Sequence, residues 1–317
     1  MQTRPFGKTG MEITPIGLGA WAIGGGNWEA GWGPQDDQES MDVIKRALDL
    51  GINWIDTAAE YGLGHSEEIV GKAIKGREKP YIFTKCSLVW DEQRKIHNSL
   101  KANSIKREAE ASLKRLDIDV IDLYQIHWPN PDEDVEEGWC ALVDLKKEGK
   151  VRHIGVSNFN VEQIKRAEKI APVETLQPPY SLIHPDVQKE ILPYCQQKNI
   201  GVIVYSPMAS GLLTGQMTPD RIKNMPNDDW RRNDSEYQEP RLSRNLALAN
   251  LLTEIGYEHS APAGVVAVAW VLHNPAVTAA IVGSRRPSQI EDMVMAAEYR
   301  LSDSEIEQID KFIANHP

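Results

Sequence analysis

The stretch Asn53–Gly62, NWIDTAAEYG, begins like a buried strand and then presents Asp56, Glu60 and Tyr61. An apolar strand that ends in a carboxylate, with a phenol five residues further on, is typical of folds in which chemistry collects where parallel strands end. The question for the rest of the chain is therefore whether other strands end in the same way.

Short β-rich runs alternate with longer segments of helical period along the chain. We expect strands to end near Gly19, Asp56, Lys85, His127, Ser157, Gln177, Ser206 and Gly283. Helices are expected over 36–51, 66–76, 104–117, 135–150, 160–170 and 185–199. Gly51 and Gly149 are expected to end helices, and Ser302 with Glu305 fits a capping box. This alternation predicts an α/β fold, and eight units favour a closed (β/α)8 TIM barrel over a doubly wound open sheet.

Two segments lie outside the repeating units. The segment 4–19, RPFGKTGMEITPIGLG, places a Lys-Thr-Gly turn between two short runs and predicts an N-terminal β-hairpin that closes the lower end of the barrel. Residues 210–240 are polar, rich in Pro and Asn and nearly aperiodic, and they follow a strand. We interpret them as a long loop over the C-terminal mouth, acting as a lid. No linker divides the chain, so residues 1–317 are expected to form a single domain.

Composition narrows the class of partner. A formal net charge of -11 argues against nucleic acid and anionic membranes, and favours a small-molecule substrate. The longest apolar run, residues 261–272, is shorter than the roughly 18 residues of a membrane-spanning helix, and the N-terminus lacks the apolar stretch of a signal peptide. Cys86, Cys140 and Cys195 are far apart, which predicts a cytoplasmic protein and no metal site.

Polar residues stand at six of the predicted strand ends. These residues are Asp56, Lys85, His127, Ser157 with Asn158, Gln177, and Tyr205 with Ser206. Parallel barrel strands all end at one mouth, so we expect these side chains to converge on one site.

The last unit, residues 279–293 (AAIVGSRRPSQIEDM), predicts an anion site. A strand is followed by Gly283 and Ser284, two arginines, and a helix that opens at Pro287. Free N–H groups at a helix start bind phosphate, and two arginines suggest a nucleotide with a 2′-phosphate. Gly17, Gly19 and Ala22 also fit the pattern G-x-G-x-x-A, but the following IGGGNW does not open a helix, so no Rossmann domain is expected.

The chain resembles the aldo-keto reductase family in seven sequence blocks that occur in the same order. These blocks are IGLGAW, DTAAEYG, TKC, IHWP, GVSNF, YSPMASGLLTG and GSRRPSQIEDM. The turn KTGMEI is similar to that of the bacterial and channel-associated branches. The resemblance implies a (β/α)8 barrel that reduces an aldehyde or ketone to an alcohol with NADPH, with NADH as a weaker cofactor.

The resemblance also assigns four catalytic roles. Tyr61 is expected to give the proton, with Lys85 lowering its pKa and Asp56 neutralising the lysine. His127 is expected to hydrogen-bond the carbonyl oxygen. We interpret Glu60 as a structural or solvated neighbour.

Cofactor contacts implied by the resemblance fall into three groups. Ser157, Asn158 and Gln177 hold the nicotinamide carboxamide, and Tyr205 stacks on the ring. The diphosphate lies along Ser206, Pro207, Met208 and Gly211, with Leu213 nearby. The 2′-phosphate end is held by Gly283, Ser284, Arg285 and Gln289.

Trp21 and Trp128 are expected to wall the carbonyl pocket, which suits an apolar or aromatic carbonyl and equally a flat sugar face. Two other functions stay open. One is a nicotinamide-binding regulatory subunit or redox sensor with slow turnover, against which His127 argues. The other is a phosphate-handling barrel such as an isomerase, which has no use for the carboxamide-type residues. Natural substrate, direction and any homo-oligomer are left open.

Overall fold

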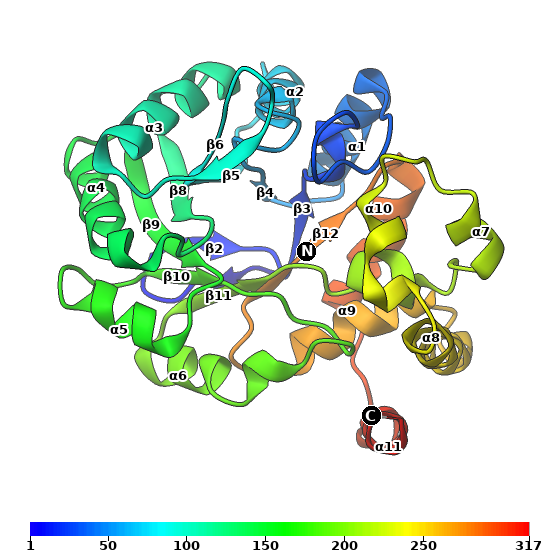
Figure 1. Ribbon diagram of the computed structural model, residues 1–317. Coiled ribbons are helices and arrows are strands. Elements are labelled where there is room, and N and C mark those ends of the chain that lie inside the picture. The colour runs from blue at the N-terminus through cyan, green and yellow to red at the C-terminus, as the bar shows by residue number, and fades with distance from the viewer. Residues whose placement is uncertain (317) are drawn as a thin grey trace.

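The computed structural model describes residues 1–316, and at its centre eight parallel strands close into a barrel (Figure 1). Strands pair with their neighbours in chain order, and the last, β12, pairs with the first, β3. The barrel strands are β3 (Ile16–Gly19), β4 (Trp54–Asp56), β5 (Tyr81–Cys86), β8 (Ile121–Ile126), β9 (Val151–Ser157), β10 (Thr175–Gln177), β11 (Gly201–Val204) and β12 (Ala279–Gly283). The predicted barrel is confirmed, and each strand ends at or close to its predicted position.

Helices surround the strands (Figure 1). They are α1 (Asp37–Asp49), α2 (His65–Ile74), α3 (Ala102–Leu116), α4 (Val135–Lys147), α5 (Val161–Glu168), α6 (Ile191–Lys198), α7 (Pro219–Lys223), α8 (Arg241–Glu258), α9 (Ala263–His273), α10 (Pro287–Met293) and α11 (Asp303–Asn315). The predicted capping box of Ser302 and Glu305 opens α11, and Gly51 and Gly149 have the left-handed backbone expected after helices. Only a short 3-10 turn, η1 (Ala22–Gly24), follows Gly19 before α1, which agrees with the rejection of a Rossmann domain.

Two predicted segments differ from the observed structure. Residues 185–199 are a 3-10 turn, η3 (Asp186–Gln188), followed by α6, because Pro193 lacks an N–H and fits only the first turn of a helix. Within 210–240, α7 and the short turns η4 (Ala209–Thr214), η5 (Trp230–Asn233) and η6 (Ser235–Tyr237) replace a plain loop. Asp229 and Asp234 cap η5 and η6. Side-chain hydrogen bonds therefore stabilise these turns, although the sequence there has no hydrophobic periodicity.

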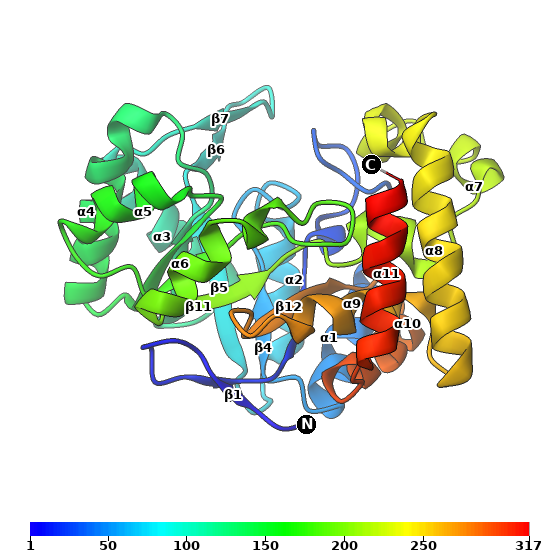
Figure 2. The same cartoon turned by 90° about the horizontal axis from the view of Figure 1, so that it is seen from below.

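The predicted N-terminal hairpin is present as β1 (Arg4–Pro5) and β2 (Glu12–Ile13). Phe6 is fully buried and stacks on Phe83 at 5.9 Å, and Met11 and Ile13 join the same cluster inside the barrel. Figure 2 shows this hairpin at one end of the molecule and a second hairpin, β6 (Leu88–Trp90) with β7 (Ile96–Asn98), at the opposite end with α7. The N-terminal hairpin therefore closes the end of the barrel that lies away from the strand C-termini.

Replacing Phe6 with Ala should lower the free energy of unfolding by about 3–5 kcal/mol, the range found when a buried Phe is truncated to Ala. Urea denaturation measures the loss. The exposed hairpin variant Lys8→Ala is the control and should change stability by less than about 0.5 kcal/mol. Equal effects of the two changes would show that the hairpin does not contribute to the core.

Candidate active site

Successive side chains of a strand point alternately into and out of the barrel, and this alternation brings polar side chains to its mouth. Phe83 and Leu123 belong to the apolar cluster inside the barrel. Lys85 and Gln125, two residues further along β5 and β8, share that inward face, and His127 follows on the same side. The polar residues that the sequence predicted at the strand ends therefore form the layer above the apolar plug.

The centre of this layer is a buried ion pair. Lys85 has no exposed surface, and its Nζ lies 2.6 Å from Oδ1 of Asp56, which is also buried. The ammonium also donates to the carbonyl oxygen of Thr57 at 2.8 Å and to the hydroxyl of Tyr61 at 3.2 Å. The structure thus brings together three of the four predicted catalytic residues through one ammonium group.

The electrostatics of Tyr61 differ from the prediction. We expected Lys85 to lower the pKa of the phenol, but burial, with the charges of Glu60 and Asp56, raises the pKa of Tyr61 well above its ordinary value of about 10. Asp56 already neutralises the ammonium at 2.6 Å, so little positive potential is left for the phenol. Tyr61 is consequently protonated near neutral pH and is ready to act as a proton donor.

A close crossing of two loops fixes the position of Tyr61. Gly24 lies against Tyr61 and Gly62 so closely that a Cβ at Gly24 would stand 2.6 Å from the Gly62 nitrogen. A Cβ at Gly62 would stand 2.3 Å from the carbonyl oxygen of Gly24, and Gly62 has a φ of 64°. Only glycine fits at both positions, so the "IGGG" run serves loop packing.

The fourth predicted catalytic residue, His127, is held by Glu60. Its Nδ1 lies 3.0 Å from Oε1 and 3.2 Å from Oε2 of Glu60, and both side chains are buried. The ring of His127 is edge-on to Tyr61, with centroids 5.9 Å apart. Of the two alternatives for Glu60, a structural or a solvated neighbour, the structure supports the structural one, because Glu60 is buried and holds the ring of His127.

The predicted carboxamide-binding residues form a connected network. Gln177 donates to Oδ2 of Asp56 at 2.9 Å, and the Ser157 hydroxyl donates to the Gln177 carbonyl oxygen at 2.7 Å. Asn158 donates to the His127 carbonyl oxygen and accepts from the Tyr205 hydroxyl at 2.8 Å. Both Asp56 oxygens are thus used, and five strand ends are coupled to each other.

The other predicted cofactor residues lie at the ends of β11 and β12. Ser206, Ala209, Ser210 and Gly211 have positive φ angles, which turns the chain sharply after β11. Leu213 has no exposed surface and packs in the core, so its side chain does not face the mouth. The remaining residues of this turn are Pro207 and Met208.

Gly283, the last residue of β12, is exposed, whereas the following Ser284 is buried and its Oγ has no hydrogen-bond partner among the described residues. Gln289 accepts from the backbone N–H groups of Arg285 and Arg286, so it caps α10 with its side chain. Pro287 stands at the start of α10, as predicted.

The Arg285 side chain is tied to the loop that follows β3. Its Nε donates to Gln35 at 2.7 Å, its Nη1 to the Trp32 carbonyl oxygen at 3.2 Å, and its Nη2 to the Pro34 carbonyl oxygen. Arg286 is exposed. In this arrangement the guanidinium of Arg285 joins the two sides of the mouth.

Two tryptophan side chains pack against Tyr61, and two more pack against the first of them. Trp21 and Trp28 lie 6.2 and 6.3 Å from the Tyr61 ring. Trp230 stacks on Trp21 at 5.6 Å, and Trp32 meets both rings edge-on. We call these four residues the tryptophan cluster. Because Trp230 comes from the 210–240 segment, that segment reaches the site.

An ion pair fastens the same segment. Arg231 pairs with buried Asp229 at 2.6 Å, and its guanidinium lies over the Trp32 ring at 4.4 Å. The predicted wall residue Trp128 stacks beside His127 at 6.4 Å and is 44% exposed, so it lies at the outer edge of the site.

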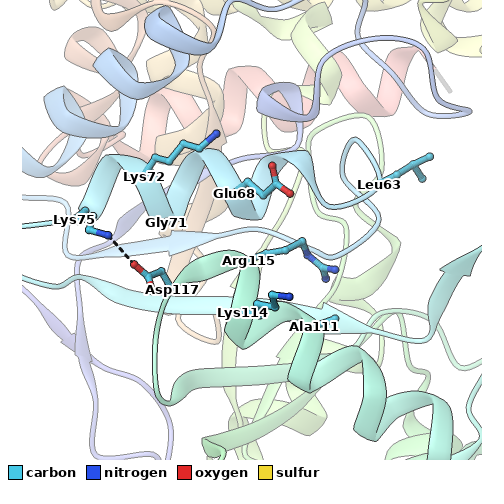
Figure 3. Close-up of a pocket in the computed structure, with 9 residues that line it drawn as sticks. All are labelled: Leu63, Glu68, Gly71, Lys72, Lys75, Ala111, Lys114, Arg115 and Asp117. Carbon is cyan, nitrogen blue, oxygen red and sulfur yellow. Dashed lines mark hydrogen bonds and ion pairs between the residues drawn. The ribbon is translucent and has the colours of Figure 1, made fainter.

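An open groove between α2 and α3 lies outside the barrel (Figure 3). Two of its cations are paired: Lys75 with Asp117 at 3.0 Å, and Arg115 with buried Glu67 at 2.6 Å. None of the predicted site residues lines it.

Comparison with known proteins agrees with this fold. The profile of the Aldo/keto reductase family matches residues 15–314. The chain belongs to the aldo/keto reductase family. It is 38% identical over 319 residues to aldo-keto reductase YhdN of Bacillus subtilis, covering 99% of this chain and 94% of the relative. It is 34% identical to the NADH-specific methylglyoxal reductase of Escherichia coli, covering 96% of each chain.

Among solved structures, the glycerol dehydrogenase AKR11B4 from Gluconobacter oxydans superposes on this aldo/keto reductase with a TM-score of 0.88. The two chains are 37% identical, and the match covers 99% of this chain and 95% of the other. In residues 1–316 of this aldo/keto reductase, no helix is long and apolar enough to cross a membrane.

Sequence reasoning missed Glu60 and three members of the tryptophan cluster. The adjacency of Glu60 to Tyr61 was visible, but only the fold shows that it faces His127. The convergence of Trp28, Trp32 and Trp230 depends on contacts between two loops that lie far apart in the chain.

Glu108 of this aldo/keto reductase, a buried carboxyl group on α3, allows a test of how stability depends on pH. It accepts from the Ser87 backbone N–H at 2.9 Å, and burial raises its pKa from 4.5 to about 7. The folded state therefore holds this proton more tightly than the unfolded state, so stability falls as pH rises from about 4.5 to about 7.

Glu108→Gln should remove this loss while keeping an acceptor for Ser87. The variant should be more stable than the wild type near pH 8, by up to about 3 kcal/mol, and equally stable near pH 4. Denaturant unfolding at both pH values measures the difference. A gain of the same size at both values would contradict the titration of Glu108.

Proposed function

We propose that this aldo/keto reductase reduces an aldehyde or ketone to an alcohol, with hydride from a reduced nicotinamide cofactor and a proton from Tyr61. The observation that carries the proposal is the buried Lys85 ammonium between Asp56 and the Tyr61 hydroxyl at the barrel mouth. The cofactor supplies a hydride to the carbonyl carbon when bound. Residues 1–317 act as one domain in this proposal.

The protein residues provide the proton and its stabilisation. The protonated Tyr61 hydroxyl donates to the carbonyl oxygen, and Lys85, 3.2 Å away, stabilises the phenolate that remains. Asp56 keeps the lysine charged in its buried position. His127 holds the carbonyl oxygen beside Tyr61. The complete set of four residues favours an enzyme over a regulatory subunit with slow turnover.

The residues at the mouth fit a nicotinamide nucleotide. The network of Ser157, Asn158 and Gln177, joined to the Tyr205 ring, would hold the nicotinamide end. The sharp turn at Ser206, Pro207, Met208 and Gly211 would hold the diphosphate through its backbone, with Leu213 as packing beneath it. The unpaired Ser284 Oγ, beside Gly283, is a ready partner for the adenosine end.

We propose NADPH as the preferred cofactor, because Arg285 stands at the adenosine end of the site. Gln289 serves that end by fixing the backbone of Arg285 and Arg286. In this proposal, Arg285 exchanges its contacts with Trp32, Pro34 and Gln35 for the 2′-phosphate. NADH remains a weaker cofactor.

The tryptophan cluster and Trp128 favour a small carbonyl substrate with an apolar or flat face. Relatives named for methylglyoxal reduction and for glycerol dehydrogenation point to short-chain oxygenated compounds as the first to screen. The free thiols Cys86, Cys140 and Cys195 are consistent with action in the cytoplasm.

Tyr61→Phe should lower carbonyl reduction by about 10²–10⁴-fold, because the phenyl ring keeps the packing and loses the proton. NADPH binding should stay within about threefold of the wild type, since Tyr61 is expected to touch the substrate oxygen. Absorbance at 340 nm follows turnover, and fluorescence titration follows binding. Near-normal turnover of the variant would remove Tyr61 from its role as the acid.

Arg285→Ala should weaken NADPH binding by about 10–100-fold and NADH binding by less than about threefold, because only NADPH carries the 2′-phosphate. Arg286→Ala is the matched control on the exposed neighbour. Equal losses for both cofactors would mean that Arg285 acts through the loop at 32–35 and does not read the phosphate.

A further inference from the structure

Glu60 and His127 form a buried pair that the catalytic roles assigned above leave unexplained. The carboxylate oxygens lie 3.0 and 3.2 Å from Nδ1, and the exposed fractions of the two residues are only 5% and 8%. No other carboxylate is bonded to this ring in residues 1–316. The other ring nitrogen, Nε2, is left for a ligand.

The number of protons on this pair decides what Nε2 can do. With two protons, one lies between Nδ1 and Glu60 and the other is on Nε2, whichever group is formally charged. With one proton, that proton stays between Nδ1 and Glu60, because a bare Nδ1 would face a carboxylate that can only accept. Nε2 then carries a lone pair and cannot donate to a carbonyl oxygen.

We propose that Glu60 is a positioning residue that makes hydrogen-bond donation by His127 depend on a second proton. The inference rests on the proposed carbonyl reduction. In the two-proton form, Nε2–H donates to the carbonyl oxygen while Tyr61 supplies the proton of the reaction. In the one-proton form, Nε2 instead accepts from an alcohol hydroxyl, which suits the reverse reaction.

The charges around the pair bear on which of the two forms is costlier in a buried site. Asp56 and Lys85 already neutralise each other, so a singly protonated Glu60–His127 pair would leave an uncompensated negative charge in a buried site. The other titratable groups that face the pair or its elements are Tyr61, Cys86, Glu108 and Tyr205. None of them brings a positive charge.

The first test reads the histidine directly and does not depend on turnover. In the protein labelled with ¹⁵N-histidine, the His127 signal is identified among eight histidines by its loss in His127→Gln. When neutral, wild-type His127 should be the Nδ1–H tautomer, with a bare Nε2. A neutral His127 that carries its proton on Nε2 would overturn the proposal, whatever the enzyme reduces.

The second test is the pH profile of kcat/KM in both directions. From near pH 6 to near pH 9, wild-type reduction should fall by at least about tenfold, while alcohol oxidation is maintained. In Glu60→Gln the amide can donate to Nδ1, so neutral His127 keeps Nε2–H and the fall in reduction should be less than about threefold. Glu60→Met, which removes the acceptor, should behave in the same way.

Glu108→Gln is the matched control, because Glu108 is a second buried carboxylate near Glu60 that does not contact His127. It should keep the wild-type profile. If both Glu60 variants keep the wild-type fall as well, the carboxylate has a structural role only. If no carbonyl is reduced by the wild type, the proposed function fails while the tautomer measurement still decides the role of Glu60.

Discussion

A lysine ammonium with no exposed surface is the constraint on which the mouth of this barrel depends. Lys85 is neutralised by Asp56 at 2.6 Å and also donates to Thr57 and Tyr61. Removing one partner of such a buried pair costs about 3–5 kcal/mol, because the other charge is left unpaired. The second oxygen of Asp56 binds Gln177, whose carbonyl oxygen binds Ser157. One ion pair therefore sets the geometry of the proposed reaction centre and of the adjacent proposed nicotinamide end.

Charge balance around that pair also determines the form in which each group is held. Asp56 cancels the ammonium, so burial and the nearby Glu60 keep Tyr61 protonated. Glu60 in turn is bonded to His127. The two side chains proposed to donate to the carbonyl oxygen therefore have different partners: Tyr61 contacts the Lys85 ammonium, and His127 contacts the Glu60 carboxylate. The tryptophan cluster covers this arrangement, so the electrostatic interactions operate in a site with restricted access to water.

The barrel could be predicted from the sequence because each strand has its own local signal: an apolar run with a polar residue at its end. Asp56, Lys85, His127 and Gln177 were found in this way, since strand ends meet at one mouth in any parallel barrel. No comparable sequence rule predicts which loops contact each other. The placement of Trp230 on Trp21, and of Arg285 on the carbonyl oxygens of Trp32 and Pro34, depends on long-range packing that periodicity does not encode. The net effect on Tyr61 was predicted wrongly because the influence of Asp56 and Glu60 on it depends on distances and burial.

The central claim is that a reduced nicotinamide nucleotide binds at this mouth, beside Tyr61 and under the tryptophan cluster. Titration of the intrinsic tryptophan fluorescence with NADPH, repeated with NADH, tests it most directly, because Trp21, Trp28, Trp32 and Trp230 all lie at the site. The account predicts saturable quenching by NADPH at one equivalent per chain, with tighter binding than for NADH. Absence of quenching by both nucleotides would contradict the proposed function and leave only the fold and the family.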